Sequence, residues 1–268
     1  MKKKLSLVLL ITSIIFVVSG CSKDDNSIPV NTFILVHGAW QGPYVWSTVK
    51  TELESKGQKV IVIELPGHGA DTTAPVTLSI NAYRDKVVAA INKTTGKVIL
   101  VGHSMGGVVI SEVAEQIPDK IKKLVYVGAF LPANGQSLLD LALQDSQSLL
   151  GASLIPSADQ LTLDIVRANV VSIFCQDASD EIKSLVVSKF RVEPAIPFTN
   201  KAVLTQSNFG KVDKYYINTL QDHAIGINLQ NQMLAAAHIS KVYPINTGHC
   251  PFLSKPDELV NLFLNIAK

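Results

Sequence analysis

Short, nearly unbroken runs of apolar residues recur along the chain, and stretches with helical periodicity separate them. The first four runs are rich in β-branched residues and cover residues 33–36, 60–63, 98–101 and 124–127. A strand that is buried on both faces of a sheet has such a run, because neither face requires polar residues. Helical spacing is found in the segments between and after them, at residues 44–55, 80–92 and 105–116. This alternation predicts an α/β fold with a wound, mostly parallel sheet.

The pattern changes after Pro132. Residues 133–197 contain amphipathic helix fragments, such as 138–150 and 158–170, and no convincing buried strand. Alternation then resumes with predicted strands at 202–204, 215–218 and 242–245 and predicted helices at 225–237 and 257–267. We therefore expect a sheet of about six strands, built from residues 31–132 and 198–268, with residues 133–197 inserted as a helical lid.

The composition is that of an ordinary globular protein. The 268 residues are 47% hydrophobic, 17% charged and 6% aromatic, and they suffice for one α/β domain. A count of 24 Lys and Arg against 22 Asp and Glu gives a net charge of +2, with no basic cluster beyond Lys2, Lys3 and Lys4. A nucleic-acid-binding protein needs a basic face, so we expect no nucleic-acid partner.

The basic cluster opens a targeting pattern, because residues 5–18 after it are almost entirely apolar. A positive start followed by a short apolar stretch is typical of a secretory signal peptide. The stretch is shorter than the roughly 20 residues that cross a bilayer, which makes a transmembrane anchor the weaker alternative. Removing residues 1–20 would take away three lysines and no acid, leaving 21 basic against 22 acidic residues, a charge of −1.

The segment ends in Val18-Ser19-Gly20-Cys21, which resembles the lipobox of bacterial lipoproteins. The resemblance implies a signal peptide at 1–20, lipid on Cys21, and a polar tether at 21–30. It predicts an exported protein anchored by lipid, with an outer membrane as its partner on either the periplasmic or the surface face. Residues 22–26 resemble a lipoprotein surface-export signal of one Gram-negative group, or are a generic linker. Plain secretion with an unmodified Cys21 is the other alternative.

Two cysteines remain, Cys175 and Cys250. Disulfides persist in exported proteins, so a bridge between the two is an alternative. We expect two buried free thiols, since nothing in the sequence brings these positions together.

The first candidate for chemistry is Gly102-His103-Ser104-Met105-Gly106, between the predicted strand 98–101 and the predicted helix 105–116. This context predicts a nucleophile elbow, in which a serine sits on a sharp strand-to-helix turn and projects its hydroxyl above the sheet. Glycines two positions before and after the serine avoid collisions with neighbouring backbone. We therefore predict Ser104 as a nucleophile.

A serine needs a histidine to accept its proton and a carboxylate to hold that histidine. His249 follows the last predicted strand, at the edge of an open α/β sheet where ligands bind, and is the best base. Asp222 follows the preceding strand and is the best acid, since Asp213 stands at that strand's opposite end. His223 is a lesser alternative base. The remaining histidines have structural positions at glycine turns or a helix end: His37, His68, His103 and His238.

An oxyanion hole needs two N–H donors. The first is the N–H that follows the nucleophile, on Met105. The loop after the first predicted strand, His37-Gly38-Ala39-Trp40, supplies the second from Ala39, because Gly38 permits a close backbone approach.

These motifs resemble one branch of the α/β-hydrolases: the hydroxynitrile lyases and plant methylesterases, with their bacterial esterase relatives. The resemblance runs from residue 32 to residue 268 and rests on His37-Gly38-Ala39, Gly42, Trp46, Gly102-His103-Ser104-Met105-Gly106-Gly107, Phe130-Leu131-Pro132, Tyr216-Ile217, Asp222, Gln232, Gly248-His249 and Pro256. It implies an α/β-hydrolase fold, a triad of Ser104, Asp222 and His249, and oxyanion donors at Ala39 and Met105. It implies no metal and no organic cofactor.

Two departures distinguish the branches. In the lyases, a lysine directly follows the catalytic histidine and a threonine stands at the position of Gly38, and both residues handle cyanide. In this chain, Cys250 follows His249. A serine nucleophile also differs from the aspartate of dehalogenase-like relatives. We therefore predict a serine hydrolase that acts on small apolar carboxylic esters. A hydroxynitrile lyase, a carbon–carbon bond hydrolase and a non-catalytic ligand-binding lipoprotein are the alternatives, and the oligomeric state stays open.

Overall fold

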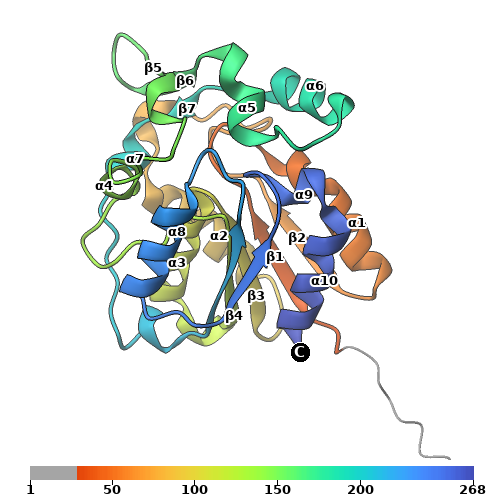
Figure 1. Cartoon of the computed structure of the whole chain (residues 1–268). Helices are drawn as coiled ribbons and strands as arrows, with labels where there is room; N and C mark the ends of the chain where they lie inside the picture. Colours follow the sequence, from red (N-terminus) through yellow and green to blue (C-terminus); the bar gives the residue numbers. More distant parts are fainter. Residues whose placement is uncertain (1–28) are drawn as a thin grey trace, which may run out of the picture.

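The computed structural model describes residues 29–268. The predicted signal peptide, the lipid site at Cys21 and most of the predicted tether lie outside the described residues. Helices and strands are labelled as in Figure 1.

A six-stranded parallel sheet forms the centre of the molecule, in the order β2-β1-β3-β4-β8-β9. Its strands are β1 (Thr32–Val36), β2 (Lys59–Ile63), β3 (Val98–His103), β4 (Ile121–Val127), β8 (Lys214–Thr219) and β9 (Val242–Ile245). The predicted wound, mostly parallel sheet is confirmed. The strand order reverses direction between β1 and β3, which makes the carboxyl ends of these two strands a topological switch point.

Helices cover both faces of the sheet (Figure 1). On one face lie α1 (Ser47–Ser55), α9 (Pro251–Ser254) and α10 (Pro256–Ala267). On the other lie α2 (Ile80–Ile91), α3 (Gly106–Gln116) and α8 (Ile227–Ala236). Short 3₁₀ turns connect these elements: η1 (Pro43–Trp46), η2 (Pro75–Thr77), η3 (Pro118–Lys120) and η6 (Phe209–Lys211).

An aromatic cluster packs one helical layer on the sheet. The ring centroids of Trp46 and Phe252 lie 4.5 Å apart, and those of Phe33 and Phe263 lie 6.1 Å apart. Such pairs contribute about 0.5–1.5 kcal/mol each beyond the area they bury. The cluster therefore fixes α9 and α10, and with them the loop that carries His249.

One predicted strand, residues 202–204, is absent from the sheet. Ala202 exchanges backbone hydrogen bonds with Gly135 and Gln136. The N–H of Val203 donates to the Glu112 carboxylate, and the N–H of Leu204 donates to the Asn134 side chain. Because these partners satisfy the backbone N–H groups, the segment needs no neighbouring strand.

Residues 133–197, here called the cap, lie over the carboxyl edge of the sheet (Figure 1). The cap contains α4 (Leu138–Ala142), η4 (Gly151–Ser153), η5 (Arg167–Asn169), α5 (Val170–Phe174), α6 (Asp180–Lys189) and α7 (Ile196–Thr199). It also contains a small antiparallel sheet of β5 (Leu154–Pro156), β6 (Thr162–Ile165) and β7 (Glu193–Pro194).

The expectation of a purely helical lid is thus incomplete, and the predicted helix at 158–170 is wrong. Residues 157–162 form the turn between β5 and β6, where Gln160 has a φ of 59° and the N–H of Ser157 donates to the Thr162 carbonyl. The predicted helix at 138–150 ends at residue 142. Strands of two to four residues carry no buried apolar run, so the hydrophobic pattern did not reveal them.

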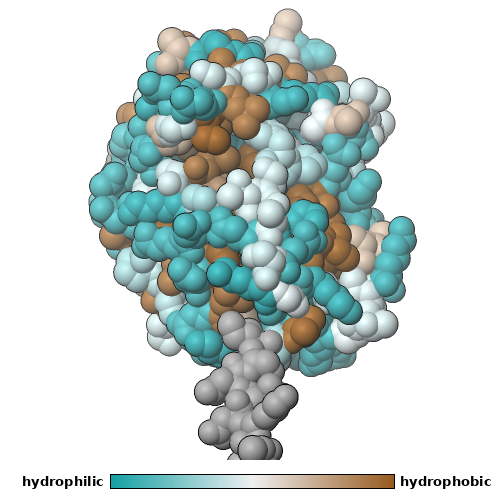
Figure 2. All heavy atoms as spheres, turned by 90° about the vertical axis from the view of Figure 1, so that its right-hand side faces the viewer, coloured by the Kyte–Doolittle hydropathy of each residue, from teal (hydrophilic) through white to brown (hydrophobic). Residues whose placement is uncertain are grey.

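The surface seen from the side of α1 and α6 is largely hydrophilic, and its apolar side chains are divided among separate patches (Figure 2). Of the helices in residues 29–268, none combines the length and the apolar character of a membrane span.

Candidate active site

The switch point brings the loops after β1 and β3 together. Val36 pairs with Gly102 across the two strands, so residues 37–40, here called the oxyanion loop, run beside the turn at Ser104. A β-carbon added at Gly38 would lie 2.7 Å from Ser104 Cβ and 2.9 Å from His103 Nδ1. Only glycine allows this approach, as the sequence predicted.

Ser104 occupies a strained turn. Its φ is 55°, in the left-handed region that few side chains adopt, and it is one of four non-glycine residues with positive φ in residues 29–268. A β-carbon at Gly102 would lie 2.6 Å from the Gly106 carbonyl oxygen, so the turn is too tight for a side chain there. This is the geometry predicted for a nucleophile elbow, with α3 starting directly after it.

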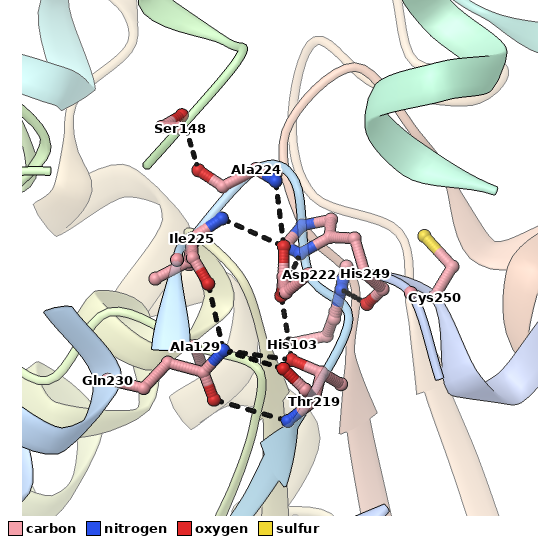
Figure 3. A network of polar contacts seen from close by, with 12 residues as sticks. His103, Ala129, Ser148, Thr219, Asp222, Ala224, Ile225, Gln230, His249 and Cys250 are labelled. Carbon is pink, nitrogen blue, oxygen red and sulfur yellow. Dashed lines mark hydrogen bonds and ion pairs between the residues drawn. The ribbon is translucent and has the colours of Figure 1, made fainter. Parts of the chain in front are cut away.

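Asp222 and His249 meet at the carboxyl ends of β8 and β9, and both are buried. The His249 Nδ1–H donates to Asp222 Oδ2 over 2.8 Å (Figure 3). The same oxygen accepts from Thr219 Oγ1 at 2.7 Å. The other oxygen accepts the backbone N–H groups of Ala224 and Ile225 at 2.7 and 2.8 Å. Four donors surround this carboxylate and satisfy both of its oxygens.

Gln230 on α8 supports the pair from below. Its amide nitrogen donates to the carbonyls of Thr219 and Ile225, and its amide oxygen accepts the N–H of Thr219. The side chain is fully buried, and Figure 3 shows it beside the Asp222 loop. The sequence did not reveal Thr219 or Gln230; of the two glutamines, the family resemblance rests on Gln232, with no role assigned to it. Gln232 lies on the exposed side of α8, two residues away, and nothing in the local pattern separates the two glutamines.

His103 joins the Ser104 turn to the His249 loop. Its Nε2–H donates to the His249 carbonyl oxygen at 2.9 Å, and the two ring centroids are 4.4 Å apart. Burial lowers the pKa of His103 well below its usual value, and the neighbouring His249 lowers it further. His103 is therefore a neutral spacer. The Nε2 atom of His249 is buried and has no hydrogen-bond partner in residues 29–268, so it is available to accept a proton.

The two predicted oxyanion donors lie on either side of the switch point. Within residues 29–268, neither the Ala39 N–H nor the Met105 N–H donates a hydrogen bond. Met105 directly precedes α3, where the positive end of the helix dipole favours a developing negative charge. Both N–H groups are thus free of internal hydrogen bonds, as an oxyanion donor must be.

The alternative residues lie elsewhere. The His223 Nδ1–H donates to the Ser172 carbonyl of the cap at 2.7 Å, so His223 does not replace His249 beside Asp222. Asp213 is exposed at the opposite end of β8 and pairs with Lys241 at 3.0 Å. His238 ends α8 with a φ of 52°.

Both cysteines in the described residues are buried free thiols, as predicted, and no bridge joins them. Cys250 Sγ accepts a hydrogen bond from Gln41 Nε2 at 3.1 Å, and Figure 3 shows Cys250 beside His249. Burial raises the pKa of the Cys250 thiol well above its usual value, so the residue after His249 carries no charge.

The cap covers the site. The ring of Phe174 lies 5.7 Å from that of His249, and the Asp177 carboxylate accepts the N–H of Gly248 at 2.8 Å. A mostly apolar cavity of about 460 Å³ is lined by the cap residues Leu138 and Leu163 and by Phe198, which follows the cap, and it reaches Ala224 next to Asp222. Within residues 29–268, no group of three or more His, Cys, Asp or Glu side chains is arranged to hold a metal ion.

Two buried neutral histidines predict acid sensitivity. Burial, and next the nearby His68, lower the pKa of His37 to about 3, and burial lowers that of His103. Histidine in the unfolded chain has a pKa of about 6.5. Below that pH the unfolded chain binds protons that the folded chain excludes, so the free energy of unfolding decreases as the pH is lowered. His37 should remove about 2 kcal/mol from the free energy of unfolding between pH 7 and pH 5, and His103 should add a loss in the same direction.

Urea unfolding at both pH values measures this difference. His68 acts in the opposite direction: its pKa is raised, so its contribution to stability grows as the pH falls from 7 and is complete below about pH 6.5, which offsets only part of the loss. His37→Gln should remove about 2 kcal/mol of the pH dependence, and the half-buried His223→Gln should leave it unchanged. Equal stability of the wild type at both pH values would contradict the expectation.

Comparisons with known proteins agree with this geometry. Residues 33–262 match the model of the alpha/beta hydrolase family. The chain is 35% identical to a putative chloroplastic methylesterase 11 of Arabidopsis thaliana, over 94% of this chain and 67% of that protein. Methylesterase 7 of the same plant is 28% identical, over 88% and 95%.

Solved structures share the fold. A pyrethroid hydrolase from Sphingobium faniae superposes with a TM-score of 0.79 at 24% identity, over 89% of this chain and 98% of the other. Polyneuridine aldehyde esterase gives a TM-score of 0.77 at 23% identity, over 90% and 100%.

Proposed function

This chain belongs to the alpha/beta hydrolase family, and on that premise we propose that it is a serine hydrolase of small apolar carboxylic esters. The observation that carries the proposal is the buried Asp222–His249 pair, whose free Nε2 lies at the same sheet edge as the strained turn of Ser104. Methylesterases and esterases among its relatives support a hydrolase function.

In the proposed reaction, Ser104 Oγ attacks the ester carbonyl while His249 Nε2 takes its proton. Asp222 holds the proton on Nδ1 and stabilises the imidazolium that forms. The tetrahedral intermediate then collapses: the bond to the alcohol breaks, and His249 returns the proton to the leaving oxygen. Water attacks the acyl-enzyme by the same route and releases the acid.

The oxyanion of both intermediates would receive hydrogen bonds from the N–H groups of Ala39 and Met105. Since neither group has a partner within residues 29–268, no internal hydrogen bond must break before the oxyanion binds. The cavity among Leu138, Leu163 and Phe198 supports an apolar acyl or alcohol group.

Hydrolysis fits this site better than cyanide elimination. The lyases of this branch use a lysine after the catalytic histidine, whereas Cys250 is a buried, neutral thiol. A departing cyanide would find no cation at that position, and its charge would be poorly stabilised.

The decisive experiment combines a fluorophosphonate probe with three substrates: para-nitrophenyl acetate, a small methyl ester and a cyanohydrin. We expect turnover of para-nitrophenyl acetate and of a small methyl ester, and covalent labelling of Ser104 by a fluorophosphonate. No labelling and no turnover would reject the hydrolase and favour a ligand-binding protein. Cleavage of a cyanohydrin without ester hydrolysis would favour a lyase.

We also propose, from the sequence alone, that lipid on Cys21 anchors the protein to an outer membrane. In a Triton X-114 extraction of the native bacterial host, the wild type should enter the detergent phase, and Cys21→Ala should enter the aqueous phase. Cys175→Ala is the matched control and should stay with the membranes. Unchanged partitioning of Cys21→Ala would contradict the lipid anchor.

A further inference from the structure

The oxyanion loop is held by the cap as well as by the sheet. Trp40, next to Ala39, has a φ of 58° and is buried. Three of its polar groups bond to the cap: the backbone N–H donates to Glu193 Oε2 at 2.7 Å, the indole N–H donates to the Leu163 carbonyl at 2.9 Å, and the carbonyl accepts the N–H of Arg191 at 3.3 Å.

Glu193 makes the strongest of these contacts. Its side chain is fully buried, and the oxygen that accepts the Trp40 N–H also accepts from His68 Nε2 at 2.8 Å. His68 follows β2, and its Nδ1–H donates to the Pro66 carbonyl at 3.0 Å. Burial lowers the pKa of His68, but the charge and hydrogen bond of Glu193, with the Pro66 carbonyl, outweigh it and leave the pKa raised. Both ring nitrogens of His68 thus face oxygen acceptors, a geometry that favours the doubly protonated ring and a buried ion pair with Glu193.

Among the described residues, two neutral rings and one cation surround the pair, and the charge of that cation, Arg191, lowers the pKa of His68. The rings of His37 and Tyr83 lie 5.0 and 5.5 Å from that of His68, and both residues are neutral because burial lowers the pKa of the histidine and raises that of the tyrosine. Arg191 directs its Nη1 to the carbonyls of Gly69 and Asp71. Glu193 Oε1 has no hydrogen-bond partner in residues 29–268.

A buried ion pair with an unsatisfied oxygen is a poor source of stability, because desolvation offsets its attraction. The geometry gives it another use: the carboxylate fixes the N–H of a residue held in the left-handed region, directly after Ala39. The Trp40 N–H belongs to the peptide group between Ala39 and Trp40, and the Ala39 N–H belongs to the peptide group before it. Because only the α-carbon of Ala39 joins these two groups, fixing the first also fixes the direction of the Ala39 N–H.

We propose that Glu193, paired with His68, is a positioning residue that holds the oxyanion loop in its donating geometry from the cap. The part of this inference that concerns catalysis rests on the proposed function. The part that concerns the loop does not, because it makes a claim about backbone structure alone.

The test compares Glu193→Leu, Glu193→Gln and wild type in the full chain, with turnover of para-nitrophenyl acetate calculated per fluorophosphonate-reactive site. Glu193→Leu should lower kcat about 100-fold and leave KM within about threefold, since losing one oxyanion donor costs about 10²–10³ in kcat. Glu193→Gln should stay within about tenfold, because its amide oxygen still accepts the Trp40 N–H.

A second measurement is independent of activity. Amide hydrogen exchange in residues 37–42 should accelerate at least tenfold in Glu193→Leu and remain near the wild-type rate in Glu193→Gln. Glu115→Leu is the matched control, because Glu115 also accepts backbone N–H groups, those of Thr205 and Phe209, from a loop bound to α3. It should change neither kcat nor exchange at 37–42.

A kcat per active site within threefold of wild type in Glu193→Leu would overturn the proposal, as would unchanged exchange at 37–42. An equal loss of kcat in Glu193→Gln and Glu193→Leu would also overturn it, because Glu193→Gln keeps an acceptor for the Trp40 N–H and that hydrogen bond would then be irrelevant. If the wild type proves inactive, the proposed function fails, and the exchange measurement alone decides whether Glu193 holds the loop.

Discussion

Ser104→Ala should lower kcat for para-nitrophenyl acetate about 10⁵- to 10⁶-fold, because the variant loses the atom that attacks the ester carbonyl. KM should change little, since the apolar cavity and the oxyanion donors remain. The residual rate should exceed that of water, because those donors still stabilise the oxyanion. Fluorophosphonate labelling should disappear.

Ser111→Ala is the matched control for this variant. Ser111 is also a fully buried serine on the elbow side of α3, and its hydroxyl donates to the Gly107 carbonyl and contacts the Tyr126 hydroxyl. Its loss should cost about 1 kcal/mol of stability, as for an ordinary hydrogen bond, and leave kcat unchanged. Turnover by Ser104→Ala within tenfold of wild type would contradict the assignment of the nucleophile.

Asp222→Asn should lower kcat about 10⁴-fold with a smaller effect on KM. Four donors face the two carboxylate oxygens, so the asparagine NH₂ group must oppose either the backbone N–H groups of Ala224 and Ile225 or His249. Facing His249, it forces the proton from Nδ1 to Nε2, and Nε2 then cannot accept the proton of Ser104.

The control is Asp213→Asn, the acid at the other end of β8, which is exposed and paired with Lys241. We expect it to retain wild-type kcat, because surface ion pairs contribute little. Stopped-flow or steady-state assays of both variants, with thermal melts to verify folding, measure the difference. Equal activity of Asp222→Asn and Asp213→Asn would remove Asp222 from the mechanism.

The positions of the strands and of the elbow were readable from sequence because both are local properties. A strand buried on two faces needs consecutive apolar residues, and β1, β3 and β4 have them. The turn at Ser104 needs glycine at positions 102 and 106, and both lie within two residues of the serine.

The cap was poorly predicted because its strands are short and half-exposed. The hairpin of β5 and β6 depends on a turn at residues 157–162 whose polar side chains bond within the turn, and no periodicity marks it. The segment 202–204 shows the opposite error. It is an apolar run, but its backbone N–H groups donate to the Gln136 carbonyl and to the side chains of Glu112 and Asn134 rather than to a strand of the sheet.

The α/β architecture and the sharp turn at Ser104 follow from the sequence alone, because local backbone preference and burial are encoded by neighbouring residues. The contacts of Gln230 with the Asp222 loop, and of Glu193 with Trp40, became visible only in the folded chain. The latter contact joins residues separated by 153 positions. Contacts of that range depend on how the chain crosses between strands and folds the cap back over the sheet, and no local pattern specifies them.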